Sequence, residues 1–154
     1  MRLRHSDWKK LFQAVAHLHS DIDPETLGSR AIAGLNSLMS GEITAFDFFE
    51  SKGSHTGKFW YDPPDAISSS EYEIFANVAH EHPFTPPVFG EMRREALMTS
   101  DFLTTTQFRQ TAIYNEYYKI YNIDHQLVLP IQVSPNLIVT CTHNRGRIDF
   151  SAEG

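Results

Sequence analysis

The segment Gln107–Tyr121 constrains the fold of this chain most, because it contains neither proline nor glycine and leads into an alternating apolar segment. Its aromatic residues recur at helical spacing, so one helix face would carry a stripe formed by Tyr114, Tyr117, Tyr118 and Tyr121. Thr104–Thr106 are candidate N-caps, and Asn122 tolerates the left-handed backbone that ends a helix. Apolar residues then alternate from Leu127 to Val133, which predicts a strand with one buried face.

The tyrosine stripe allows two interpretations. Tyrosines wall ligand pockets well, since each ring offers a flat apolar surface and carries a hydroxyl group at its tip. Tyrosines also pack helices onto sheets, with their hydroxyl groups reaching solvent or backbone. The packing role is the commoner one for any single tyrosine, because aromatic side chains so often fill protein cores.

Two amphipathic helices are predicted before the first strand. The first opens at Ser6-Asp7, and its apolar face comprises Trp8, Leu11, Phe12, Val15 and Leu18. The second begins with Asp23 as its N-cap and Pro24 in its first turn, and it ends at Ser40-Gly41.

The remaining patterns complete an α+β fold. Strands are predicted over residues 43–50, 56–61 and 137–143, with a polar hairpin loop over 51–55, a short strand over 96–99 and a last helix from 149. A third helix follows a cap at Ser68, and three prolines argue against regular structure from His80 to Pro87. Neighbouring strands with short connections predict an antiparallel sheet with helices packed on it.

Length and charge narrow the function classes. The 154 residues suit one domain. The 19 acidic and 13 basic residues give a net charge of −6, which argues against binding to a nucleic acid backbone. A single cysteine excludes an internal disulfide and a zinc site made of cysteines alone. We find no signal peptide and no long apolar run, so we expect a cytoplasmic protein that does not contact membranes.

Cysteine and histidine residues supply the candidates for metal or thiol chemistry. Cys141 and His143 share one face of the last predicted strand, where they could bind a metal or form a reactive pair. The commoner arrangement is an inert buried thiol, with His143 at the edge of the sheet. His80, His82 and His125 have the residue type of a three-histidine metal site. We expect no metal site, because His82 more simply fixes the geometry of its proline-rich loop.

Enzymatic motifs are absent from the sequence. It contains no G-x-S-x-G elbow, no phosphate-binding P-loop and no H-E-x-x-H pair, so we do not expect an enzyme. Arg109 and Glu116 lie about two turns apart on one face of the predicted helix. Arg109 could contact an acidic ligand, but a surface ion pair with Glu116 is the simpler interpretation.

Three segments carry a family resemblance: HEHPF at 80–84, SDFLTTTQFRQTAIYNEYYK at 100–119 and THNRGRIDFS at 142–151. They resemble the amino-terminal, GAF-like sensory domain of LuxR-type transcriptional regulators. In that family a serine-aspartate-phenylalanine step precedes a helix with a tyrosine-asparagine-glutamate-tyrosine-tyrosine core, here residues 114–118. The resemblance implies one GAF-like sensory domain over residues 1–154, an antiparallel sheet flanked by helices. A helix-turn-helix DNA-binding domain is expected downstream and is absent from this chain.

The resemblance implies a ligand-sensing regulatory domain. We expect a small apolar or aromatic effector between the sheet and the helix that starts near Thr106, with no cofactor identified. The expected lining residues are Phe46, Phe48, Trp60, Phe84, Tyr114, Tyr118, Leu129 and Val139. We also expect a homodimer that contacts DNA only through the downstream domain, with ligand binding changing the spacing of two such domains.

An interaction module is the alternative hypothesis. In this case the core would be filled, no ligand would bind, and the first helix would form a dimer interface together with the helix that starts near residue 149.

Overall fold

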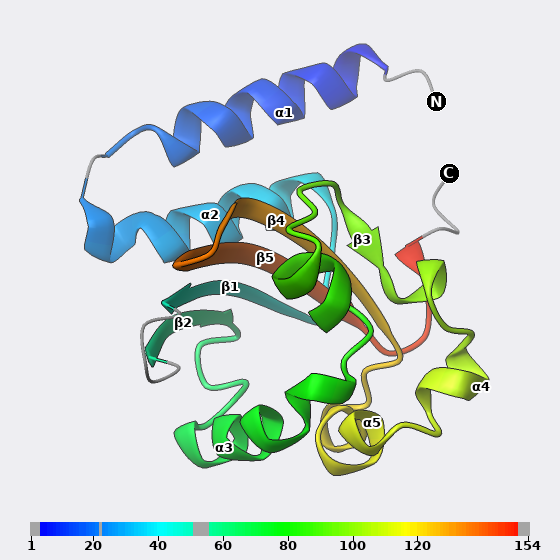
Figure 1. Cartoon of the computed structure of the whole chain (residues 1–154). Coiled ribbons are helices and arrows are strands. Elements are labelled where there is room, and N and C mark those ends of the chain that lie inside the picture. Colours follow the sequence, from blue (N-terminus) through cyan, green and yellow to red (C-terminus); the bar gives the residue numbers. More distant parts are fainter. Residues whose placement is uncertain (1–3, 22, 51–55, 151–154) are drawn as a thin grey trace.

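The computed structural model describes residues 4–21, 23–50 and 56–150, which form an antiparallel sheet flanked by helices (Figure 1). The sheet has five strands in the order β2-β1-β5-β4-β3, so β5 is central. The strands are β1 (Ile43–Glu50), β2 (Thr56–Asp62), β3 (Leu97–Met98), β4 (His125–Ser134) and β5 (Leu137–Arg145), and all neighbouring pairs are antiparallel. The predicted α+β class, with an antiparallel sheet flanked by helices, is confirmed; the loop over 51–55 lies outside the described residues.

Helices cover both faces of the sheet (Figure 1). On one face lies α2 (Pro24–Leu38), with α1 (His5–Leu18) packed on α2. On the other face lie α3 (Ser69–Val78) and α5 (Ala112–Glu116), and α4 (Thr105–Phe108) lies to the side of α5 (Figure 1). The short turns η1 (Ala79–Glu81), η2 (Thr85–Gly90), η3 (Thr99–Asp101) and η4 (Tyr118–Tyr121) connect these elements. Each face therefore has its own apolar core.

Side-chain caps start the helices where the sequence predicts them. The Asp23 carboxylate accepts the Glu25 backbone N–H at 3.0 Å, and Ser68 forms a reciprocal capping box with Glu71. Thr104 caps α4, and Asn122 ends η4 in the left-handed conformation with a φ of 57°. These local predictions are confirmed.

The single helix predicted over Gln107–Tyr121 is wrong, because the segment forms α4, α5 and η4 in succession. Thr111 starts a new helix within the segment. Its hydroxyl group donates to the Phe108 carbonyl oxygen at 2.7 Å and accepts the Tyr114 backbone N–H at 3.2 Å. A threonine cap thus outweighs helix continuation, and the tyrosines come from separate short elements.

Three further predictions need correction. The segment from His80 to Pro87 is partly regular, because Pro86 and Pro87 lie in the first turn of η2, where a backbone N–H is not needed. The strand after Asn122 is buried on both faces, since Gln126 and Val128 are buried as well as Leu127. His143 is fully buried on the central strand and does not lie at the sheet edge.

The first helix is the largest departure from the predicted burial. Trp8, Phe12 and Val15 are 46%, 68% and 46% exposed, although they belong to its predicted buried face. Because α1 packs on α2, its burial is confined to the side that faces α2, where Ala14 lies.

Candidate functional site

The alternation of β1 divides the sheet into two chemically different faces. We call the side covered by α2 the α2 face, and it carries the cluster of Phe46, Val139, Cys141, Phe48 and Trp60. We call the side covered by α3 and α5 the α3 face. It carries Asp47, which lies between Phe59 of β2 and Thr140 of β5 in the pairing register.

The residues expected to line the ligand site do not share one space. Five of them pack on the α2 face, namely Phe46, Phe48, Trp60, Leu129 and Val139. The other three belong to the clusters on the α3 face, namely Phe84, Tyr114 and Tyr118. The sheet itself separates the two groups.

The α2 face holds a small apolar hollow. It has a volume of about 200 Å³, and its lining includes Leu129 and Cys141, so it falls below the roughly 300–1,000 Å³ of typical ligand pockets. Its one charged neighbour is Arg30, whose guanidinium group already donates to the backbone carbonyl oxygens of Leu18, Asp21 and Asp23. This hollow offers no polar group to orient a ligand.

The α3 face holds a carboxyl group deep in the molecule. Asp47 keeps some accessible surface, yet burial raises its pKa to about 7, against the weaker opposing effect of hydrogen bonds from Thr140 and Thr142. These threonine hydroxyl groups are 3.4 and 3.5 Å from the carboxylate, at the long end of hydrogen bonding. The carboxyl group is therefore half-buried on the sheet surface that faces α3 and α5, where some of its surface stays accessible.

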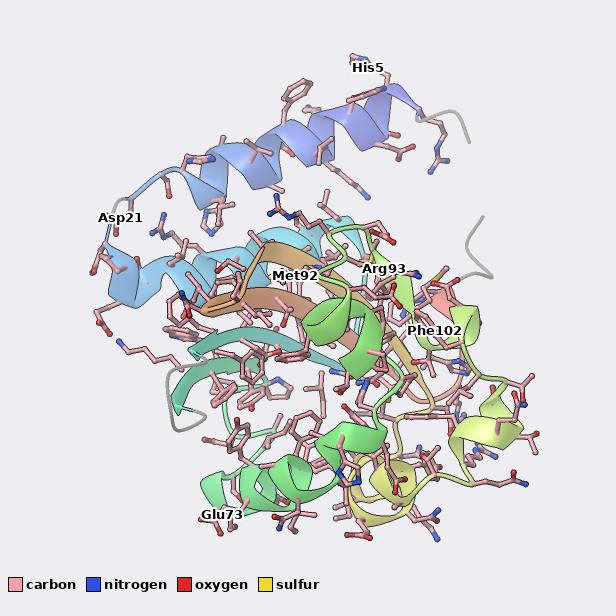
Figure 2. The ribbon with its side chains drawn as sticks, in the orientation of Figure 1. His5, Asp21, Glu73, Met92, Arg93 and Phe102 are labelled. Carbon is pink, nitrogen blue, oxygen red and sulfur yellow. The ribbon has the colours of Figure 1, made fainter. Side chains whose placement is uncertain are left out.

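Tyrosine rings lie near this carboxyl group. Burial is the main cause that raises the pKa values of Tyr61, Tyr72, Tyr117 and Tyr118, and the nearby Asp47 charge raises each of them further. The rings come from β2, α3 and the α5–η4 junction, and side chains of these elements lie between the sheet and the helices (Figure 2). The site therefore combines an acid with several aromatic rings.

Phenylalanine rings extend the aromatic wall. The Phe59 and Tyr72 ring centroids are 4.4 Å apart, and those of Phe75 and Tyr117 are 5.1 Å apart. These contacts join β2 to α3 and α3 to α5. The position of α3 thus depends on rings that lie beside Asp47.

A buried histidine closes one side of the site. The Nδ1 atom of His82 accepts the Phe84 backbone N–H at 3.1 Å, so the proton of the neutral ring lies on Nε2. That atom is 2.9 Å from Gln126 Oε1 and 3.0 Å from the Tyr118 hydroxyl group. Burial lowers the His82 pKa to about 4, so the ring is neutral near pH 7, and its predicted role in fixing the loop is confirmed.

The other candidate groups are structural. Burial raises the pKa of the Cys141 thiol to about 12, which makes it inert, as the commoner interpretation predicts. Arg109 pairs with Asp124 at 2.5 Å and not with Glu116, because the break at Thr111 removes the shared helix face. Within the described residues, no group of three histidine, cysteine or acidic side chains is arranged to hold a metal ion.

Sequence reasoning missed Asp47. The signal was present, because this aspartate interrupts the largely apolar run ITAFDFF, which forms a strand with neighbours on both sides in the sheet. A buried acid is costly, so its presence in a core strand points to a function.

Comparisons with known proteins find similarity in fold but none in sequence. No family model matches the sequence, and no curated protein matches it. The structure resembles the ligand-binding domain of VqsR from Pseudomonas aeruginosa, with 13% identity, a TM-score of 0.62 and coverage of 94% of this chain and 83% of that one.

Two further solved structures agree. The N-acylhomoserine lactone dependent LuxR family transcription factor CepR2 from Burkholderia cenocepacia matches with 8% identity, a TM-score of 0.66 and coverage of 97% and 84%. The chain has the fold of a LuxR-type ligand-binding domain. SdiA from Escherichia coli matches with 9% identity, a TM-score of 0.60 and coverage of 90% of this chain and 55% of that one. The expected LuxR-type sensory fold is thereby confirmed. The described part of the chain contains no helix with the length and apolarity needed to cross a bilayer.

Proposed function

We propose that this chain is the ligand-sensing domain of a LuxR-type transcriptional regulator in the cytoplasm. A small molecule binds on the α3 face, between the sheet and the helices α3 and α5, and the domain has no catalytic activity. Contact with DNA is made by a helix-turn-helix domain outside residues 1–154, and ligand binding changes how two such domains are held.

The Asp47 carboxyl group carries this proposal. It is the one acid that the fold places in the middle of a core strand, accessible and without a close partner among the described residues. Ligand sites combine apolar walls with a few polar groups that fix orientation, and the α3 face supplies both. The expected residues Tyr118 and Phe84 remain part of this site, while the five residues on the α2 face are assigned to packing against α2. Tyr114 is assigned to packing against Phe108, beside the pair of Arg109 and Asp124.

Native mass spectrometry of the purified protein, followed by thermal-shift measurements against a broad metabolite panel, tests this proposal. We expect either a co-purified small molecule or a stabilising compound. The matched variants Tyr118→Phe and Trp60→Phe show on which face the compound binds. Only Tyr118 lies on the α3 face, so only Tyr118→Phe should change its affinity. Binding that responds to Trp60→Phe alone would place the ligand on the α2 face, and binding of no compound would contradict sensing.

A dimerisation module is the second candidate function, and the exposed side of α1 favours it. Trp8 and Phe12 stack with ring centroids 6.2 Å apart and remain largely exposed. They line a shallow apolar groove of about 530 Å³ together with Lys9 and Ala16. Exposed apolar patches of this kind mark association surfaces.

A further inference from the structure

We propose that the space beside Asp47 binds a small organic cation, with a substituted ammonium group placed against the Asp47 carboxylate and between tyrosine rings. This inference rests on the proposed function, because it names the chemical class of the molecule that the α3 face would sense.

The first argument is the missing counter-charge. Asp47 receives only the two long contacts from Thr140 and Thr142, and no lysine, arginine or histidine of the described residues forms an ion pair with it. A carboxylate that is largely withdrawn from water and has no positive partner is disfavoured. A cationic ligand supplies the partner that the protein lacks.

The second argument is the chemistry of the walls. The face of an aromatic ring attracts cations, and ammonium groups bind between several such rings. Phe59 lies opposite Asp47 in the strand pairing, and its ring centroid is 4.4 Å from that of Tyr72, while Tyr61 lies two residues further along β2 on the same face. Rings and carboxylate thus favour the same charge, and an anionic ligand would be repelled by both.

The third argument is that the neighbouring groups stay uncharged. The tyrosine pKa values are raised, so these hydroxyl groups remain protonated near neutral pH, as does that of Tyr121. His82 is neutral because its pKa is about 4. Asp47 is therefore the group of this space that changes charge in the neutral range.

Calorimetric titration of the 154-residue protein with two matched probe pairs tests the inference. Choline is compared with its uncharged carbon isostere 3,3-dimethylbutan-1-ol, and phenethylammonium with 2-phenylethanol. We expect the cation of at least one pair to bind about tenfold more tightly than its neutral partner. Asp47→Asn removes the charge at nearly constant shape and should abolish this preference. Glu73→Gln removes one exposed charge on the outer side of α3 (Figure 2) and should preserve it.

A second measurement does not depend on a variant. Choline is charged at every pH, so its affinity should rise about tenfold between roughly pH 6 and pH 8, as the fraction of ionised Asp47 increases. The matched neutral alcohol should show no such rise.

The outcomes separate the two proposals. Equal or tighter binding of the neutral probes, or a cation preference that survives Asp47→Asn, overturns the cation inference while supporting a ligand site. Failure of all four probes also overturns it. A metabolite panel without any bound compound overturns the proposed function itself.

Discussion

At the scale of the residue, Asp47 serves the proposed function but lowers the stability of the fold. Its pKa rises from 3.8 to about 7 on folding because of burial. The native state therefore retains a proton that the unfolded chain has released between these values, so Asp47 makes the free energy of unfolding fall as pH rises through this window. Above the native pKa the full cost of the buried charge is present.

Asp47→Asn should therefore stabilise the protein at alkaline pH. We expect the free energy of unfolding to increase by about 1–3 kcal/mol near pH 8 and to change little near pH 4, because the removed charge exists only above the native pKa. Urea unfolding of both proteins at the two pH values measures this. A variant that is less stable at pH 8, or equally shifted at both pH values, would show that the carboxylate is paired.

At the scale of the element, the contact of α2 with the sheet depends on a missing side chain. A Cβ atom at Gly28 would overlap the Trp60 ring, whereas one at Gly34 would lie 3.6 Å from the Ala14 carbonyl oxygen and 3.8 Å from its Cβ atom, in ordinary contact. The same substitution therefore has opposite effects at two positions of one helix.

Gly28→Ala should lower the free energy of unfolding by about 2–3 kcal/mol through overpacking. Gly34→Ala is the matched control and should raise it by about 0.5–1 kcal/mol, since alanine favours the helix more than glycine does. Chemical denaturation measures both. Equal effects of the two substitutions would mean that α2 does not pack closely on β2.

The elements also show how far the sequence predicts this molecule. Caps at Asp23, Ser68 and Thr104 were predictable because a cap depends on a few neighbouring residues. The break at Thr111 was not, because a threonine suits a helix interior as well as a cap. The division of the expected site between two faces was hidden for a different reason, since alternation within a strand does not reveal which helix covers which face.

At the scale of the whole molecule, the exposed side of α1 predicts self-association. We expect light scattering to report a dimer, and Phe12→Asp to shift the mass toward a single chain by weakening association about tenfold or more. Ile120→Asp is the control, because Ile120 is 60% exposed on η4, an element that does not belong to α1. A monomeric wild type, or equal effects of the two substitutions, would contradict a dimer through α1.

The central strand joins the proposed site to the carboxyl-terminal residues. Thr140 and Thr142 of β5 contact Asp47, and Arg145 at its end donates to the Ser40 carbonyl oxygen and lies 4.2 Å over the Phe150 ring. A strand bonded to neighbours on both sides resists bending. A ligand that displaces Thr140 and Thr142 would therefore shift β5 as a rigid strand, and this shift would move Arg145 and Phe150. In this way β5 would couple the ligand site mechanically to the residues that follow it.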